Sequence, residues 1–168
     1  MLWLIGMMGS GKTTVGMAVA AHLGLDFVDT DLLVASVTES SITELWDDEG
    51  EQSFRHLESQ MIASAAAGEP VVVATGGGAI LDRTNIDVMR SSGLVVWLTA
   101  APSTLAERVG RDGSRPLLAQ ADDPVERLGT LVEEREARYR EAAHATVATD
   151  GKTVESVADE VLAVWNAS

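Results

Sequence analysis

The sequence predicts an α/β domain of three layers, in which a five-stranded parallel sheet lies between two layers of helices. Short apolar runs alternate with longer segments of helical periodicity, which is the pattern of repeated β-α-β units. The first apolar run also leads through a glycine-rich loop directly into a helical segment. The chain has 168 residues, which is the size of one domain, so we expect a single domain over residues 1–168.

Strands are expected where the apolar runs are short, at residues 2–5, 26–29, 71–75, 94–98 and 145–149. Helices are expected where helical periodicity follows, at residues 12–23, 31–38, 41–67 with a break near Gly50, 82–92, 102–111, 123–143 and 153–166. The sixth helix has a clear start signal, because Asp123 suits the N-cap, Pro124 the first helical position and Glu126 the first turn. Alternation of this kind places helices on both faces of the sheet.

Residues 111–122 show no clean periodicity and contain Gly113 and Pro116. A loop of about ten residues in a compact domain is usually functional or mobile. We therefore predict a mobile lid over residues 111–123.

Composition excludes several classes of protein. Hydrophobic residues make up 46% and charged residues 23% of the chain, as in ordinary globular domains, and there is no cysteine for a disulfide scaffold, a Cys-ligated zinc site or a thiol nucleophile. A net charge of −14 and 4% aromatic residues argue against nucleic-acid binding. Apolar runs such as residues 94–101 are too short to span a bilayer, and the N-terminus has no basic region of a signal peptide. We expect a cytoplasmic monomer.

Residues 6–13 fit the phosphate-binding pattern G-x-x-x-x-G-K-[ST] between an apolar strand and a helix, which is the context that makes this motif credible. In such a loop the backbone N–H groups converge on phosphate oxygens at a helix N-terminus. Lys12 is expected to reach the β and γ phosphates, and the Thr13 hydroxyl can ligate Mg²⁺. The residues expected to line this nucleotide site are Gly9, Ser10, Gly11, Lys12, Thr13 and Thr14. The alternative is a glycine-rich turn with an exposed lysine.

This loop does not identify the reaction, because hydrolytic switches, motors and small-molecule kinases all contain it. The sequence has no Asn-Lys-x-Asp guanine-recognition motif, which argues against a GTPase.

Two carboxylates and three glycines are expected beside the phosphate site, because parallel strands place their carboxyl ends at one edge of the sheet. Asp29 and Asp31 follow the second strand and are two residues apart, so one can hold magnesium and the other a substrate hydroxyl. They could instead cap and begin the next helix. Residues 76–78 are glycines after the third strand, where N–H groups can approach a ligand, although glycine-rich turns are common.

Arginines supply most of the positive charge in the second half, since seven of the ten lie between residues 108 and 140. One of them, Arg135, falls within an apolar helical stripe made of Leu128, Leu131, Val132, Tyr139 and Ala142. A guanidinium on a core-facing stripe needs an anionic partner, which could be a protein carboxylate or a substrate carboxylate. Arg55 leaves a similar choice, because Glu58 lies three residues on and could form a simple helical salt bridge.

With these motifs in order, the sequence resembles the shikimate kinases over nearly its whole length. The matching segments are residues 6–13, Asp29-Thr30-Asp31, residues 50–58, Gly76-Gly77-Gly78, Arg115-Pro116-Leu117-Leu118 and Arg135-x-x-x-Tyr139. The phosphate loop is generic, whereas the other segments together are more specific. The resemblance implies a P-loop kinase fold that uses Mg²⁺ and ATP to phosphorylate the 3-hydroxyl of shikimate.

The resemblance also assigns roles to residues. It implies that Arg55 and Arg135 hold the shikimate carboxylate, that Asp31 holds the ring hydroxyls, and that Gly76, Gly77 and Gly78 line the same subsite. It implies that Arg115 on the lid reaches the transferred phosphate, that Arg108 lies against adenine, and that Asp29 with Thr13 forms the magnesium environment. The implied catalytic residues are Lys12, Asp31 and Arg115. Two positions depart from the family pattern, because Glu39 replaces the usual glycine and Trp46 the usual phenylalanine.

Two other functions remain open at this point. One is a related kinase of a small metabolite, such as gluconate or a nucleotide, since two arginines and an aspartate suit any hydroxy-acid. The other is a catalytically silent homologue that binds nucleotide as a regulatory partner. The presence of Lys12, Asp31 and Arg115 argues against the silent homologue.

Overall fold

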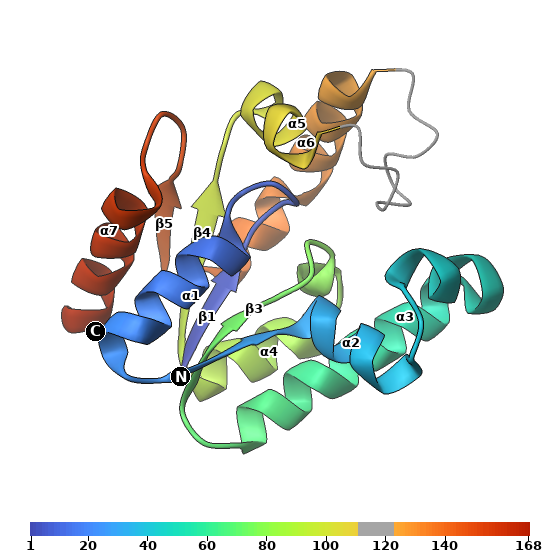
Figure 1. Ribbon diagram of the computed structural model, residues 1–168, viewed down its shortest axis with the longest axis horizontal. Helices are drawn as coiled ribbons and strands as arrows, with labels where there is room; N and C mark the ends of the chain where they lie inside the picture. Colours follow the sequence, from blue (N-terminus) through green and yellow to red (C-terminus); the bar gives the residue numbers. More distant parts are fainter. Residues whose placement is uncertain (111–122) are drawn as a thin grey trace.

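In the computed structural model, which describes residues 1–110 and 123–168, a single parallel sheet lies between two layers of helices (Figure 1). The expected three-layer α/β arrangement is therefore confirmed. Of the lid predicted over residues 111–123, all except Asp123 lies outside the described residues, and so does Arg115.

The five strands form at the predicted places. They are β1 (Leu2–Ile5), β2 (Asp26–Asp29), β3 (Val71–Ala74), β4 (Leu94–Thr99) and β5 (Ala145–Ala148). They lie in the order β2-β3-β1-β4-β5, and every pair of neighbours is parallel. Leu4 of β1 pairs with Ala74 of β3 and Val96 of β4, so the loops that follow β1, β2 and β3 leave the sheet side by side.

The helices also follow the prediction closely. They are α1 (Lys12–Leu23), α2 (Thr30–Thr38), α3 (Ile42–Ala67), α4 (Arg83–Ser92), α5 (Pro102–Val109), α6 (Pro124–Ala142) and α7 (Val154–Asn166). The helical path of α3 is interrupted at Gly50 (φ 84°, ψ 167°), where a break was predicted. A short 3₁₀ turn, η1 (Ala79–Leu81), follows the glycines after β3 and was not predicted. In the described ranges no helix is both long and apolar enough to cross a lipid bilayer.

Alternation along the central strand β1 divides the core between the two helical layers. Trp3 and Ile5 pack in a cluster with residues of α3, α4 and α6, such as Ile62, Ile86 and Leu131. Leu2 and Leu4 pack on the opposite face against α1 and α7. Figure 1 shows α1 and α7 together on one side of the sheet. Burying these side chains on both faces fixes the strand edge from which the loops emerge.

Side-chain caps fix the starts of the two helices that matter most for the site. Asp123 accepts hydrogen bonds from the N–H groups of Val125 (2.8 Å) and Glu126 (3.2 Å) at the start of α6, which confirms the predicted N-cap. Ser41 and Glu44 form a reciprocal capping box at the start of α3. Each cap satisfies N–H groups that the helix cannot pair itself.

Near the N-terminal ends of β4 and β5, His144 bonds to β4 through both its backbone and its ring. Its N–H donates to the Val95 carbonyl (2.8 Å), and its Nδ1 accepts from the Val95 N–H (2.9 Å). The ring must therefore be neutral at Nδ1 to keep this bond. Burial, and after it the nearby Arg90 guanidinium, lowers the pKa of His144 below its ordinary value of 6.5.

We predict that His144 makes the protein less stable in mild acid. Because the pKa of His144 is lower in the folded state, the unfolded chain binds the proton more readily. The stability that the neutral ring contributes is therefore present above pH 6.5 and is lost as the pH falls below it. His144→Asn keeps an acceptor for the Val95 N–H but cannot be protonated. Urea unfolding at about pH 7.5 and at about pH 5, on either side of the ordinary histidine pKa, should show a weaker pH dependence for this variant.

The matched control is His22→Asn, which removes an exposed histidine whose ring bonds to the Ala18 carbonyl of its own helix. If His144→Asn and the parent protein lose stability in parallel on acidification, the assigned role of the His144 ring is wrong.

Candidate active site

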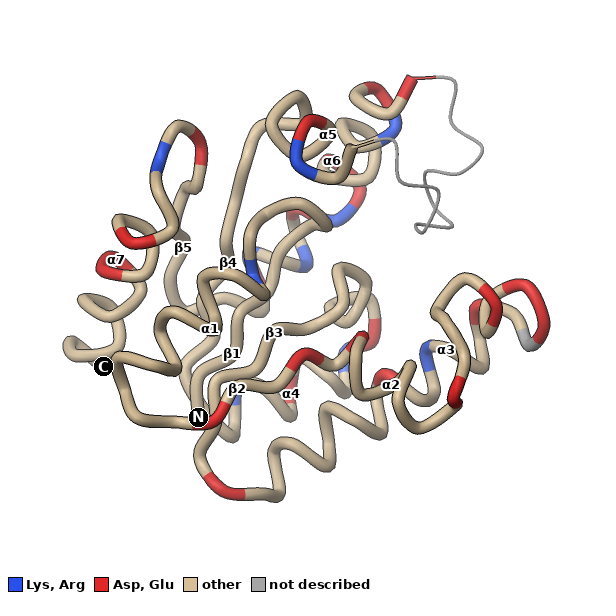
Figure 2. Tube along the Cα trace, in the orientation of Figure 1, with Lys and Arg blue, Asp and Glu red and all other residues tan. Residues whose placement is uncertain are grey.

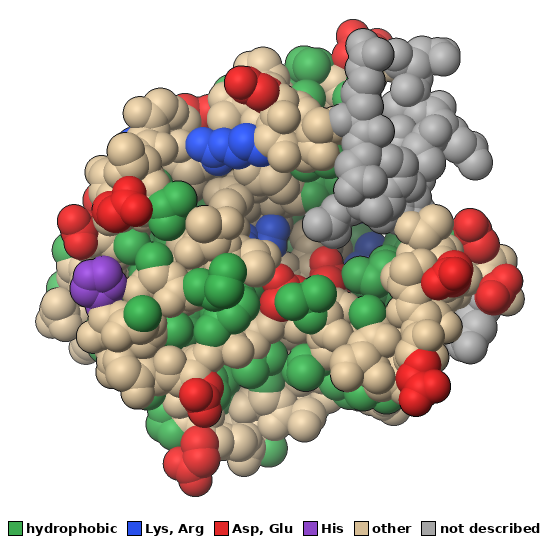
Figure 3. Space-filling model, viewed as in Figure 1, with side chains coloured by type: hydrophobic (Ala, Val, Ile, Leu, Met, Phe, Trp, Pro, Cys, Tyr) green, Lys and Arg blue, Asp and Glu red, His purple; other side chains and the backbone are tan. Residues whose placement is uncertain are grey.

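A cleft of about 1040 Å³ opens where β1, β2 and β3 end. Figure 3 shows this face hollowed, with a cationic side chain in its floor and acidic side chains beside it. The phosphate loop and the start of α1 form the floor of the cleft, and Asp29 and Asp31 lie on one side of it. Arg108, Thr149 and Lys152 lie on the other side. All of the predicted nucleotide residues in the described ranges line this cleft: Gly9, Ser10, Gly11, Lys12, Thr13, Thr14 and Arg108.

The phosphate loop curls around the head of Lys12. Its Nζ donates to the carbonyls of Gly6 (2.8 Å) and Met7 (2.9 Å), so the ammonium group lies within the loop. Helix α1 begins at Lys12, which leaves the N–H groups of its first turn directed at the cleft. A positive side chain and a helix N-terminus therefore act together on one place, where an anion such as phosphate is stabilised.

Asp29 connects the phosphate loop to α2. Its Oδ2 accepts from the Thr13 hydroxyl (2.7 Å), and its Oδ1 accepts from the Asp31 N–H (3.0 Å) as the N-cap of α2. The capping role considered from the sequence is therefore confirmed, and Asp29 also lines the cleft, while its role toward magnesium stays a prediction. Thr13 and Asp29 present hard oxygen atoms side by side at the phosphate loop, and this donor set suits Mg²⁺.

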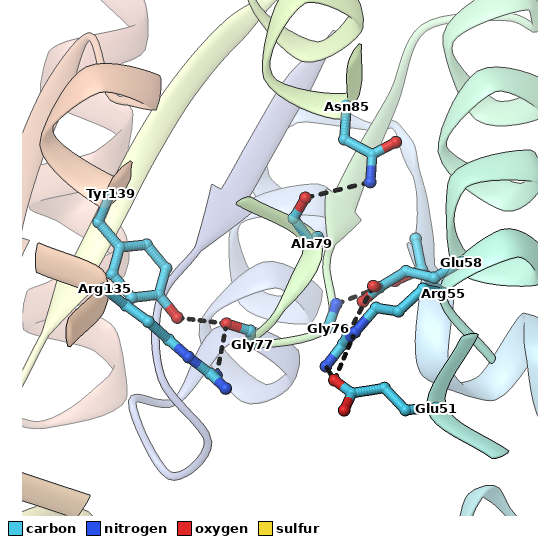
Figure 4. A network of polar contacts seen from close by, with 10 residues as sticks. Glu51, Arg55, Glu58, Gly76, Gly77, Ala79, Asn85, Arg135 and Tyr139 are labelled. Carbon is cyan, nitrogen blue, oxygen red and sulfur yellow. Dashed lines mark hydrogen bonds and ion pairs between the residues drawn. The ribbon is translucent and has the colours of Figure 1, made fainter. Parts of the chain in front are cut away.

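A smaller hollow of about 60 Å³ adjoins the cleft and shares Met8, Asp31, Ile42 and Gly77 with it. Its remaining walls are Trp46, Phe54, Arg55, Glu58, Gly76, Gly78 and Arg135. Figure 4 shows Arg55 and Glu58 reaching this region from one side and Arg135 from the other, with Gly77 between them. All of the predicted substrate residues are therefore brought together: Asp31, Arg55, Gly76, Gly77, Gly78 and Arg135.

Arg55 is paired with acids of its own helix. Its Nη1 donates to Glu58 Oε2 (2.7 Å), while Nε and Nη2 lie 3.4 and 3.3 Å from Glu51 Oε1. The possible helical salt bridge is thus present. The guanidinium also lies 5.4 Å from the ring centre of Trp46 and 5.2 Å from that of Phe54, which is cation–π geometry. These contacts orient Arg55 in the wall of the hollow.

Arg135 has a different environment. Its guanidinium belongs to a residue only 6% exposed, and Nη1 donates to the Gly77 carbonyl (3.2 Å). Across residues 1–110 and 123–168, no carboxylate lies within 4.0 Å of it, so the internal ion pair considered from the sequence is not found there. A buried guanidinium without an acid is costly, and an incoming anion can offset that cost.

Each of the three glycines after β3 lies directly against at least one charged side chain. A Cβ on Gly76 would overlap the carboxylates of Glu58 and Asp31, and a Cβ on Gly78 would overlap the guanidinium of Arg55. The carbonyl of Gly77 accepts from Arg135. Any side chain at Gly76 or Gly78 would therefore push apart the charged groups that converge on this turn.

Glu58 is the buried acid of this cluster, with a side chain 1% exposed. Burial raises its pKa, and the nearby charge of Asp31 acts in the same direction, while Arg55 and Arg135 oppose the shift. One of its oxygens is bonded to Arg55, and the other, Oε1, has no hydrogen-bond partner in the described part of the chain. The sequence suggested Glu58 only as a helical partner of Arg55, since its position relative to Asp31 depends on how α3 packs.

Arg108 connects the phosphate loop to the turn between β5 and α7. It donates to the hydroxyl and the carbonyl of Thr149 (both 2.8 Å) and, at 3.3 Å, to the carbonyl of Gly9. Thr149 and Lys152 line the same side of the cleft and were not identified from the sequence. Residues of this turn carry no motif, so only their position beside Arg108 reveals them.

Most acidic side chains lie away from the cleft, apart from Asp29 and Asp31 in its wall and the two acids paired with Arg55. Figure 2 shows acidic positions gathered at the outer end of α2 and α3 and near the starts of other helices. The Debye length is about 8 Å at physiological salt, so distant carboxylates are screened at the cleft. The net charge of −14 is therefore compatible with an anion site built from a few local cations.

Comparison with known proteins is consistent with this arrangement. The family described as shikimate kinase matches residues 8–166. A shikimate kinase from Symbiobacterium thermophilum is 43% identical over 161 residues, which cover 95% of this chain and 92% of that one.

Solved structures give the same result. The shikimate kinase of Acinetobacter baumannii, determined in complex with shikimate, has a TM-score of 0.95 and 35% identity, and the match covers 99% of this chain and 92% of that one. A gluconokinase from Sinorhizobium meliloti has a TM-score of 0.59 and 26% identity, over 96% of this chain and 89% of that one. The chain thus resembles the shikimate kinase much more closely than this gluconokinase.

The packing of Arg55 predicts different costs for its two acids. Glu58→Ala should lower the free energy of unfolding by about 2 kcal/mol, because it removes the buried partner of a charged hydrogen bond. Glu51→Ala, the matched control on the same arginine, removes a side chain that is 53% exposed and should change it by less than about 1 kcal/mol. Urea unfolding at neutral pH measures both. Equal losses in the two variants would contradict the assignment of Glu58 as the main anchor.

Proposed function

The chain belongs to the shikimate kinase family, and from that premise we propose that it transfers the γ-phosphoryl group of ATP to the 3-hydroxyl of shikimate. The observation that carries the proposal is the state of Arg135, a buried guanidinium without an acid partner in the described chain, beside a phosphate cleft. A substrate that combines a carboxylate with hydroxyl groups supplies both the missing anion and the acceptor.

The acceptor would bind in the smaller hollow. Its carboxylate would lie between Arg135 and Arg55, which approach from α6 and α3 on either side of Gly77 (Figure 4). Guanidinium groups hold a carboxylate through paired hydrogen bonds of fixed direction, which a lysine does not reproduce. Asp31 lines both the hollow and the cleft, so it is suited to hold a ring hydroxyl where the two cavities meet.

The nucleotide would bind in the larger cleft. The loop of residues 6–13 and Lys12 would hold the β and γ phosphates, and Arg108 would lie against the adenine base. The family uses Mg²⁺ with ATP, and Thr13 and Asp29 are the residues that would hold the ion. When bound, Mg²⁺ neutralises charge on the phosphate oxygens.

In the transfer itself, the 3-hydroxyl oxygen forms a bond to the γ-phosphorus while the bond to the β–γ bridging oxygen breaks and ADP leaves. The hydroxyl proton passes to the Asp31 carboxylate. Such transfers have a loose transition state, so positioning and charge stabilisation supply most of the catalysis. Lys12 would stabilise the phosphoryl oxygens, and we propose the same role for Arg115, which lies outside the described residues. An arginine of this kind contributes on the order of 10³–10⁵ in rate.

The proposal predicts a clear order of acceptors. ADP release should be measured with shikimate, gluconate and a nucleoside monophosphate in parallel. The kcat/KM for shikimate should exceed the others by at least about a hundredfold. Its ring holds the carboxylate and the 3-hydroxyl at a fixed separation, whereas open-chain gluconate must order several rotatable bonds at about 0.5–1.5 kcal/mol each, and a nucleoside monophosphate has no carboxylate for the two arginines. Lys12→Met, the control, should release little ADP with any acceptor. Equal or faster turnover of gluconate would reject shikimate as the substrate.

A further inference from the structure

Tyr139 lies behind the acid subsite and not in its wall. It is four residues after Arg135 on α6, so both side chains leave the same face of the helix. It is 1% exposed and is not among the residues that line the hollow. Its hydroxyl donates to the Gly77 carbonyl at 2.6 Å, and this carbonyl also accepts from Arg135 (Figure 4). One backbone oxygen is therefore shared between a neutral donor and a charged one.

The tyrosine ring has little freedom to move. It stacks on Trp97 with ring centres 5.3 Å apart and an interplanar angle of 11°. Its hydroxyl also lies 3.5 Å from the sulfur of Met7. Burial raises the pKa of the Tyr139 hydroxyl, so the group stays protonated and donates throughout the range in which an enzyme is assayed.

The Gly77 carbonyl belongs to the same peptide plane as the Gly78 N–H. A trans peptide is planar, so holding the carbonyl on one side fixes the direction of the N–H on the other. The turn uses its other groups internally, since Ala79 N–H donates to Gly76 O (3.2 Å) and Leu81 N–H to Gly78 O (2.9 Å). Gly78 lines the hollow, and its N–H has no acceptor among the described residues.

We propose that Tyr139 is a positioning residue: its hydroxyl holds the Gly77–Gly78 peptide in the orientation that directs both the Arg135 guanidinium and the Gly78 N–H toward the substrate carboxylate. This rests on the proposed function, because it needs an acidic substrate in the hollow. Without the hydroxyl, a peptide between two glycines can rotate, and Arg135 keeps only a movable acceptor.

Steady-state kinetics of Tyr139→Phe test this role, with shikimate and its neutral methyl ester as alternative acceptors. The variant should raise KM for shikimate about tenfold, the effect of one lost hydrogen bond, and leave KM for ATP unchanged within error. The ratio of kcat/KM for the acid to that for the ester should fall, because the variant loses recognition of the carboxylate. Leu128→Val, the control, removes a methylene elsewhere in the same core cluster and should lower thermal stability without changing this ratio.

A parallel rise of both KM values, or an unchanged acid-to-ester ratio, would reduce Tyr139 to a core residue and overturn the proposal. Parent enzyme that turns over neither acceptor would instead reject the proposed function. Should Tyr139→Phe fail to fold, uniform labelling with 3-fluorotyrosine marks this position alone, since the chain has one tyrosine. Its ¹⁹F resonance should shift on addition of shikimate and much less with the methyl ester, and equal responses to both would also overturn the proposal.

Discussion

The guanidinium of Arg135 is buried on the apolar face of α6, and the residue is only 6% exposed. Within the described chain it donates to a backbone carbonyl and is not paired with a carboxylate. A charge in this position costs free energy in the unliganded protein. The fold keeps it because the packing of α6 on the sheet is secured by Leu128, Leu131 and Tyr139 on the same stripe. In the proposed function, this buried charge favours the binding of an acid from outside the chain, and the other residues of the substrate side act around it.

The glycine turn after β3 is the place where the charged side chains of the substrate side meet. Helix α6 brings Arg135 and Tyr139 to the Gly77 carbonyl, while α3 brings Arg55 and Glu58 against Gly78 and Gly76. These two helices join the turn from opposite sides, and parallel strand order places the turn beside the phosphate loop. Asp31 stands between the two cavities. In the proposed function, this edge of the sheet would bring the phosphoryl donor and acceptor together, and the charged side chains would set their orientation.

The sequence predicted the sheet and the helices well, because buried strands and amphipathic helices leave periodic patterns. It also placed Arg135 on a buried stripe. It could not decide whether its anion came from the protein, since that depends on α3 directing Glu58 to Arg55 instead. The helical spacing places Tyr139 on the apolar stripe, but spacing indicates only which face of the helix a side chain is on and not the carbonyl that its hydroxyl binds. The turn η1 is too short for a periodic signal. The roles of Arg115 and the lid, and the monomeric state, stay predictions.

The measurement that tests the buried charge most directly is urea unfolding of the parent protein and Arg135→Met, each with and without shikimate. Without ligand, the variant should be at least as stable as the parent, because a costly buried charge is replaced by an apolar chain of similar length. Shikimate at about a hundredfold excess over its Kd should stabilise the parent by about 2.7 kcal/mol and leave the variant unchanged. A variant that is much less stable without ligand, yet gains as much from shikimate, would show that the fold itself satisfies Arg135.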